Sequence, residues 1–249
     1  MTASPNVKNL FVELTESIEP IVNQISNSLS IPLNCLVPEK IWREQTRKNL
    51  LNYALGVDIK ERINSGFELI IKDIESNLSQ IEIDSIKKEF NDGIPKLSAA
   101  CNHKKVEESN KADLPPSPQS IMCLSDATIE NFYCSGMRYF NLKSFEPASD
   151  VFYVLTFLDF YRHNLWLAYG LAEQSCGHME TALQAYAKAA LTNPLSPLPY
   201  IYSVECCLKI GENQQAISYI DLAFDAFEKN TELNKEYLPR IVQLQQKCK

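Results

Sequence analysis

A 34-residue periodicity in the second half of the chain restricts its fold more than any other feature. In the clearest copy, which starts at His163, aromatic, small and proline residues occupy the defining positions. These residues are Trp166, Gly170, Ala182, Tyr186, Ala189 and Pro194. Such a pattern is typical of pairs of antiparallel helices that repeat along the chain and stack on their neighbours.

Two weaker copies flank the clear one in the same register. The first starts at Ile129 and has Lys143 where the turn glycine is expected, although it keeps Phe132, Gly136, Ala148 and Phe152. The third starts at Pro197 and has Val204 and Ile220 where a small and an aromatic residue are expected. Three copies in register predict an all-α fold, a three-repeat tetratricopeptide (TPR) superhelix.

The ends of the predicted helices carry their own signals. Gly177 is expected in the turn between the two helices of the second repeat, because a residue just beyond a helix often adopts a left-handed conformation. Ser125 is expected to cap the first repeat helix and Thr231 the last helix of the chain. Apolar residues at helical spacing predict that residues 231–249 form a C-terminal capping helix over the last repeat.

The composition fits one or two globular helical domains. The 249 residues are 45% hydrophobic and 22% charged, with few glycines. The net charge of −7 argues against nucleic acid as a partner, because binding to duplexes relies on basic patches. No apolar run approaches the roughly 20 residues that a membrane span needs, and the N-terminus lacks the pattern of a secretory signal.

No residue pattern in the chain predicts catalysis, a cofactor or a metal site. A phosphate-binding glycine loop, a nucleophile motif and a histidine with a carboxylate at a recognisable spacing are all missing. Cys176 and His178 flank a turn glycine without a further ligand nearby in sequence. Most of the eight cysteines are interpreted as reduced thiols, and a redox switch at Cys206 and Cys207 is the less favoured alternative.

The first half of the chain predicts further helices without the 34-residue register. Apolar residues recur at helical spacing over 10–29, 38–55, 58–78 and 83–90, and Asn91-Asp92-Gly93 is expected to end the last of these helices. We interpret these segments as a small helical bundle. The alternative is a module for dimerisation or partner docking.

The resulting domain organisation has three parts. Residues 1–95 are predicted to form the N-terminal helical domain, and residues 123–249 the TPR domain with its capping helix. Residues 96–122 between them are rich in charge and proline, which predicts a disordered linker.

In TPR proteins, fixed positions on the first helix of each repeat face the concave groove. Here most of these positions carry aromatic or aliphatic side chains, which soluble proteins rarely leave exposed without a partner. The predicted peptide-binding residues are Tyr133, Met137, Phe140, Leu167, Leu171, Gln174, Ile201, Glu205 and Leu208. The alternative is that a terminal helix folds back over part of this surface.

Residues 124 to about 227 resemble the class II chaperones of bacterial type III secretion, the SycD/LcrH/IpgC-like family. The resemblance depends on four stretches: 124–133, Phe145-Glu-Pro-Ala148 with Phe152, Leu158-Asp-Phe-Tyr161 leading into 165–170, and 182–186 with 205–211. It implies three TPRs, a location in the bacterial cytoplasm and a groove that binds an extended segment of a hydrophobic translocator. In this family, helices before the first repeat form homodimers.

The expected function is therefore that of a non-catalytic secretion chaperone. It would hold a hydrophobic translocator or effector soluble by binding an apolar segment in the concave groove. The alternative function is a TPR adaptor that joins two protein partners of the secretion apparatus.

Overall fold

A computed structural model of the protein describes residues 57–102 and 116–248. These residues form helices, with no strand among them, which confirms the all-α prediction. The chain divides into two compact units, Met1–Ile129 and Glu130–Lys249. Within the described ranges, no helix combines the length and the apolar character that crossing a bilayer requires.

The first unit contains the helices α3 (Val57–Asn77) and α4 (Gln80–Asn102). The apolar residues predicted at helical spacing are buried in it, namely Ile63, Phe67, Ile70, Ile74, Ile83, Ile86 and Phe90. The rings of Phe67 and Phe90 meet edge to face, with their centroids 6.2 Å apart. Ser79 and Glu82 form a capping box at the start of α4, in which the Ser79 N–H donates to the Glu82 carboxylate at 2.8 Å.

Helix α4 does not end at Gly93, and this part of the prediction is wrong. The helix continues to Asn102 through both Gly93 and Pro95. The glycine at residue 93 allows the backbone of Met122 to pack closely against α4 and does not form a turn. A Cβ at this position would lie 2.7 Å from the carbonyl oxygen of Met122. Burial of Leu97, which is 2% exposed, gives the last turns of the helix an apolar anchor.

The disorder expected over residues 96–122 is wrong at both ends of this range, where the chain is helical. A short helix, α5 (Pro118–Met122), follows the undescribed residues 103–115 and packs against α4. Ser117 caps α5 by accepting a hydrogen bond from the Ser120 N–H. Ordered structure on both sides of 103–115 therefore belongs to the first unit and not to a linker.

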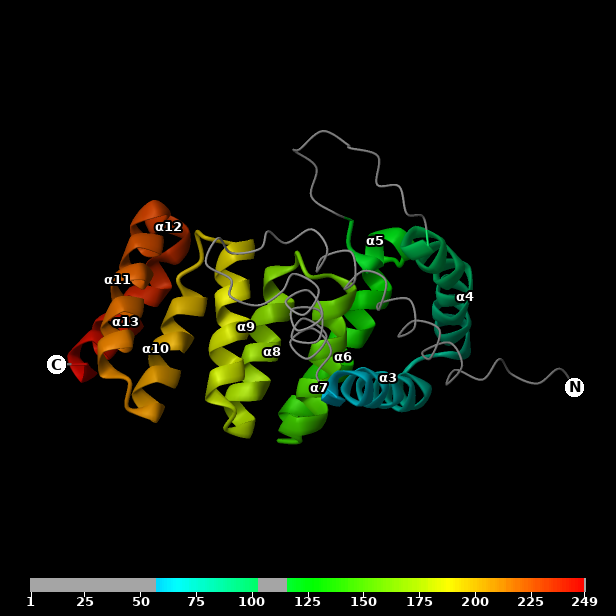
Figure 1. The fold of residues 1–249 in the computed structure, drawn as a ribbon, viewed down its shortest axis with the longest axis horizontal. Helices are drawn as coiled ribbons and strands as arrows, with labels where there is room; N and C mark the ends of the chain where they lie inside the picture. The colour runs from blue at the N-terminus through cyan, green and yellow to red at the C-terminus, as the bar shows by residue number, and fades with distance from the viewer. Residues whose placement is uncertain (1–56, 103–115, 249) are drawn as a thin grey trace, which may run out of the picture. The chain divides into compact units, whose positions relative to one another are not determined.

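Three helix pairs whose bounds follow the 34-residue register make up most of the second unit, and the first of these helices begins in the last residues of the first unit (Figure 1). The first helices of the pairs are α6 (Asp126–Asn141), α8 (His163–Cys176) and α10 (Leu198–Ile210). The second helices are α7 (Phe145–Leu158), α9 (Met179–Thr192) and α11 (Asn213–Lys229). Successive helices from α7 to α11 pack on one another, as the repeat pattern predicted, and ring contacts join α6 to α7. The predicted cap is also present at the start of α6, where Ser125 Oγ accepts from the Thr128 N–H at 3.2 Å.

The turns within the three repeats share one backbone conformation. Lys143, Gly177 and Gly211 occupy the same position of successive repeats, with φ angles of 60°, 92° and 83°. The left-handed turn is thus retained in the first repeat although its residue is a lysine. An L-residue other than glycine is strained in this region.

The third repeat replaces the small and aromatic pair by two aliphatic residues. Val204 and Ile220 occupy these positions and are only 1% and 2% exposed. The larger residue on α10 is matched by a smaller one on α11, which conserves the volume between the helices. The departure from the sequence pattern therefore does not interrupt the core.

The C-terminal segment packs on the last repeat, as expected for a capping helix. It consists of α12 (Thr231–Asn234), a 3₁₀ turn η1 (Lys235–Tyr237) and α13 (Leu238–Lys247). Ile241 and Leu244 of α13 join the apolar core of α10 and α11. The predicted cap at Thr231 is wrong, because the side chain of Asn230 accepts the hydrogen bond from the Leu233 N–H instead.

The helices predicted over 10–29 and 38–55 lie outside the described residues. The homodimer expected to form through helices before the first repeat depends on the same part of the chain.

Candidate peptide-binding pocket

An apolar pocket opens between the first helices of all three repeats. Its volume is about 210 Å³. The residues that line it are Tyr133, Met137, Phe140, Phe152, Asn164, Leu167, Ala168, Leu171, Leu198 and Tyr202. They come from α6, α7, α8 and α10, and none of these described lining residues is charged.

The α6 wall carries the three residues that the sequence predicted for the first repeat. Tyr133, Met137 and Phe140 project from one face of α6 because they are spaced at four and three residues. The Tyr133 ring packs on Phe152 with the centroids 5.6 Å apart, and the Phe140 ring packs on Phe145 at 5.3 Å. These aromatic contacts fix the shape of the wall before any ligand arrives.

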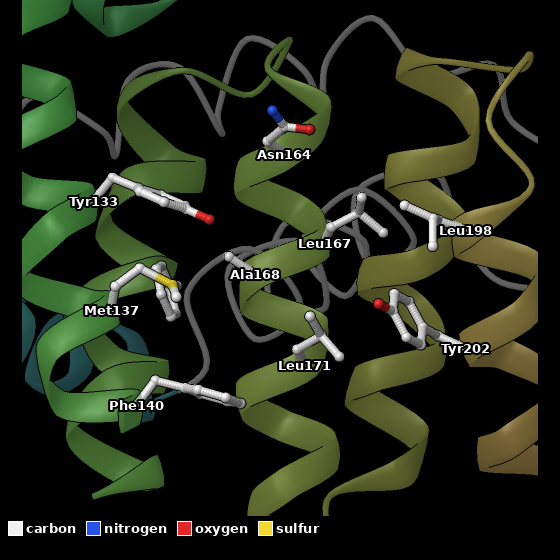
Figure 2. A pocket seen from close by; sticks show the side chains of 10 residues that line it. Tyr133, Met137, Phe140, Asn164, Leu167, Ala168, Leu171, Leu198 and Tyr202 are labelled. Atoms are coloured by element: carbon white, nitrogen blue, oxygen red, sulfur yellow. The ribbon is translucent and has the colours of Figure 1, made fainter. Parts of the chain in front are cut away.

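Figure 2 shows polar atoms within an otherwise apolar lining. The hydroxyl groups of Tyr133 and Tyr202 point into the pocket from opposite sides, and Asn164 lies at one edge. Burial raises the pKa of Tyr133, and the nearby Glu130 carboxylate raises it further. Tyr133 is therefore a neutral hydroxyl at physiological pH and is suited to hydrogen bonding with a peptide backbone.

The α8 wall contains Leu167 and Leu171, two of the residues predicted to bind a peptide, together with Ala168, which was not predicted. Gln174 lies one turn further along α8, where its side-chain oxygen accepts a hydrogen bond of 2.6 Å from the Tyr186 hydroxyl. It does not line the pocket. Burial, the leading cause, raises the pKa of Tyr186, so this hydroxyl remains a donor.

The third repeat differs most from the prediction. Ile201 is completely buried in the core with Val204 and Ile241, so its assignment to the open groove is wrong. Leu208 packs against the same core and is not among the pocket residues. The residues of α10 that do line the pocket are Leu198 and Tyr202.

Glu205 is engaged by the capping helix. Arg240 of α13 donates to Glu205 Oε1 from Nε at 3.1 Å and from a terminal nitrogen at 2.6 Å. The same guanidinium lies over the Tyr202 ring, 5.0 Å from its centroid. A terminal helix thus covers this end of the predicted surface, as the alternative interpretation held, while the pocket between the three repeats stays open.

Phe152 and Tyr202 also line the pocket, although neither was predicted to bind a peptide. Phe152 matches the wedge position between helices, and only the structure shows that it also lines the pocket beside Tyr133. Tyr202 stacks on Tyr186, with the ring centroids 5.4 Å apart. An aromatic residue one position after Ile201 was the available sequence signal.

His178 has a carboxylate partner that the sequence did not reveal. Its Nδ1 lies 2.9 Å from Glu173 Oε2, and the Ser149 hydroxyl donates to the other oxygen of Glu173. In a catalytic triad the hydroxyl must contact the imidazole, which then removes its proton. Here the carboxylate lies between the two groups, so the arrangement orients His178 and does not activate Ser149.

The buried thiols of α10 are poor nucleophiles. Cys206 and Cys207 are both 0% exposed. Burial raises the pKa of Cys206 to about 12 and also raises the pKa of Cys207. Since the thiolate is the reactive form, neither residue is suited to redox exchange at neutral pH.

The chain is similar in sequence to curated proteins of known name. Over 118 residues the chain is 29% identical to low calcium response locus protein H of Yersinia pestis, a match that spans 47% of this chain and 70% of that protein. The chain is homologous to low calcium response locus protein H. The protein of the same name from Yersinia pseudotuberculosis is 28% identical over an equal length. No family model matches the sequence.

Solved structures with a similar arrangement of helices include type III secretion chaperones. The Yersinia enterocolitica translocator chaperone SycD is 23% identical with a TM-score of 0.49, and the match covers 53% of this chain and 98% of SycD. A structure of SycD with a peptide of the translocator YopD is 26% identical with a TM-score of 0.46, and the match covers 50% of this chain and 95% of that chain. A structure of PcrH with the chaperone-binding region of PopB is 27% identical with a TM-score of 0.46, and the match covers 49% of this chain and 97% of PcrH.

Proposed function

We propose that the protein is a non-catalytic type III secretion chaperone of the bacterial cytoplasm. It binds an extended apolar segment of a hydrophobic translocator or effector in the pocket between α6, α8 and α10. The observation that carries this proposal is the uncharged, largely apolar lining supplied by the first helices of all three repeats. An exposed apolar surface of this kind typically marks a site of interaction with another protein.

The size of the pocket favours side chains of a peptide over a cofactor. Its volume of about 210 Å³ lies below the roughly 300–1,000 Å³ of common small-molecule sites. The Tyr133 and Tyr202 hydroxyls offer hydrogen bonds to a peptide backbone, while Met137 adapts to different apolar side chains. A large aliphatic or aromatic anchor residue of the client fits these features.

The homology supports the same assignment. The match to low calcium response locus protein H covers 118 residues, which is 47% of this chain and 70% of that protein. The partner implied by the resemblance to class II chaperones, a hydrophobic translocator, has the chemistry that this lining would bind. The capping helix leaves the pocket accessible, because it contacts α10 and α11 and contributes no lining residue.

The variants that test this proposal must change the pocket and preserve the core. Replacing Tyr133 and Phe140 by Ala would remove ring contacts with Phe152 and Phe145 and would lower stability as well as binding. The double variant Met137→Glu with Leu171→Glu is preferable, because it places charge in the pocket from two partly exposed positions. Burying those charges against an apolar client is costly.

A matched control carries the same added charge elsewhere. Leu142 and Leu191 are 75% and 74% exposed and lie outside the pocket, so Leu142→Glu with Leu191→Glu changes the net charge equally. Each protein is used to capture partners from the native bacterium, and the captured proteins are identified by mass spectrometry. Circular dichroism verifies that all three proteins keep their helicity.

The proposal predicts that a hydrophobic secreted protein is captured by the wild type and the control but lost with the pocket variant. Co-expression of that client with each chaperone should then keep it soluble only where the pocket is intact. Equal capture by all three proteins would contradict the proposal and favour an adaptor that uses another surface.

A further inference from the structure

A second cluster of functional groups lies where the first and second repeats meet. Glu146 is in the first turn of α7, Cys176 is the last residue of α8, and His178 directly precedes α9. One ligand atom from each, an oxygen, a sulfur and a nitrogen, lies within 4.8 Å of the other two. Thirty residues separate Glu146 from Cys176, so sequence spacing did not reveal this cluster.

The turn between Cys176 and His178 has a defined geometry. Gly177 has a φ of 92°, and its left-handed conformation ends α8. The Gly177 N–H donates to the Gln174 carbonyl at 3.3 Å, and the His178 N–H donates to the Glu173 carbonyl at 2.9 Å. Two backbone hydrogen bonds therefore hold both candidate ligands on one closed turn.

A buried carboxylate orients the imidazole of His178. Glu173 is 1% exposed and contacts Nδ1 of His178 at 2.9 Å, while Ser149 donates to its other oxygen. In the neutral tautomer that donates from Nδ1 to Glu173, Nε2 keeps its lone pair for a metal, and Nε2 lies 3.9 Å from Glu146 Oε1. Histidine ligands of metal sites characteristically have such a carboxylate behind the ring, where it fixes the tautomer and the orientation.

We propose that Glu146, Cys176 and His178 bind a zinc ion, with the fourth coordination position open to water or to a ligand from another molecule. Mixed sulfur, nitrogen and oxygen donors suit Zn²⁺ and exclude Mg²⁺ and Ca²⁺, which bind oxygen. Tetrahedral zinc places ligand atoms about 3.3–3.6 Å apart. The 3.9 Å between Nε2 and Oε1 reaches this range through a small rotation of the exposed Glu146 side chain.

In the zinc complex Cys176 would be a thiolate whose proton is released to solvent, and His178 would bind through the lone pair of a neutral imidazole and Glu146 through its carboxylate. The bound ion would connect the start of α7 to the turn between α8 and α9. Because these elements belong to different repeats, the ion would stabilise their stacking. The binding free energy adds to the free energy of unfolding when the unfolded chain binds zinc less tightly.

The experiment uses the full-length protein, stripped of metal and kept reduced. Cobalt(II) is titrated first, because a thiolate ligand gives a near-ultraviolet charge-transfer band and tetrahedral coordination gives strong visible bands. Zinc is then titrated in competition with a chromophoric chelator to obtain the affinity and stoichiometry. Cys123→Ser is the matched control. Cys123 is an exposed cysteine at the C-terminal end of α5 and does not belong to the cluster.

The expected result is one equivalent of zinc per chain and a cobalt–thiolate band that Cys176→Ser abolishes and Cys123→Ser leaves unchanged. His178→Gln should weaken zinc binding at least tenfold, and Glu146→Gln should weaken it less, since water replaces an exposed carboxylate readily. Zinc should raise the melting temperature of the wild type and of Cys123→Ser, but not that of Cys176→Ser.

Two results would overturn the proposal. One is the absence of a thiolate band in the wild-type protein. The other is a band that survives Cys176→Ser, which would assign the metal to other cysteines. Glu173→Gln tests the positioning role separately: zinc affinity should fall about 10–100-fold. Circular dichroism on each variant distinguishes loss of the site from loss of the fold.

Discussion

The backbone of Gly170 lies directly against the ring of Tyr186, so that a Cβ at residue 170 would be 2.7 Å from Tyr186 Cδ1. The same relationship recurs 34 residues earlier, where a Cβ on Gly136 would be 2.6 Å from Phe152 Cε1. A small residue on the first helix of a repeat thus makes room for an aromatic ring on the second. This pairing explains why the two residue types recur together in the sequence.

Gly170→Ala should destabilise the protein in the wild-type background. Overpacking costs about 1–3 kcal/mol, of which the higher helix propensity of alanine restores up to about 1 kcal/mol. In a Tyr186→Leu background the ring is gone, and the same substitution should become neutral or stabilising. Urea unfolding of the four proteins measures this double-mutant cycle. The same destabilisation in both backgrounds would show that the ring does not set the requirement for glycine.

Substitutions at two of the left-handed turn residues should change the stability of the protein in opposite directions. Lys143 has a φ of 60°, so Lys143→Gly should relieve strain and stabilise the protein by about 0.5–1 kcal/mol. Gly211 has a φ of 83° and open space around it, so Gly211→Ala should destabilise by about 1–2 kcal/mol through backbone strain alone. Urea unfolding measures both changes. A loss of stability in Lys143→Gly would contradict the equivalence of the turns.

The capping helix should be held by its apolar residues more than by its ion pair. Leu244 is 4% exposed, and Leu244→Ala should cost about 2–5 kcal/mol. Arg240→Ala should cost about 1 kcal/mol, because the side chain of Arg240 is 40% exposed and solvent screens its pair with Glu205. Chemical denaturation of both variants tests whether Leu244→Ala lowers the free energy of unfolding more than Arg240→Ala does. An equal or larger cost for Arg240→Ala would assign the attachment of α13 to the ion pair and its stacking on Tyr202.

Alkaline pH should destabilise the protein partly through Cys206. The pKa of this thiol is raised by burial from 9.0 to about 12 in the folded chain, so above pH 9 the unfolded chain loses a proton that the folded chain keeps. The stabilising contribution is complete below pH 9 and is lost progressively as pH rises toward 12. The slope from this one group reaches about 1.4 kcal/mol per pH unit.

Cys206→Ala isolates this contribution. The variant should lose less stability than the wild type between about pH 8 and about pH 10.5, when both are unfolded in urea at each pH. The pKa of Tyr237 is also raised, but without a contribution from Cys206, so its effect is the same in both proteins and cancels in the comparison. The charge of Cys206 contributes to the raised pKa of Tyr219, so the variant also reduces the smaller contribution of Tyr219. Parallel losses in the two proteins would show that the Cys206 thiol ionises equally in the folded and unfolded chains.

The sequence by itself determined the repeat register, because that register depends on local steric requirements. Each helix pair requires a glycine where an aromatic ring lies against its first helix. Each pair also requires a left-handed residue in its turn, so both requirements recur at a fixed interval. The walls of the pocket on α6 and α8 follow from the same register, since Tyr133, Met137 and Leu167 fall on the sides of their helices that face the pocket.

Only the tertiary structure decided which residues the last repeat leaves open. The burial of Ile201 depends on the helices packed around α10, and Glu205 is occupied because Arg240 reaches it from α13, 35 residues away. Likewise, Gly93 reads as a helix end until Met122 is packed against it, and Glu146 has no relation to His178 until the repeats stack. Helical periodicity specifies which face of a helix is apolar, whereas contacts between distant segments determine what covers that face.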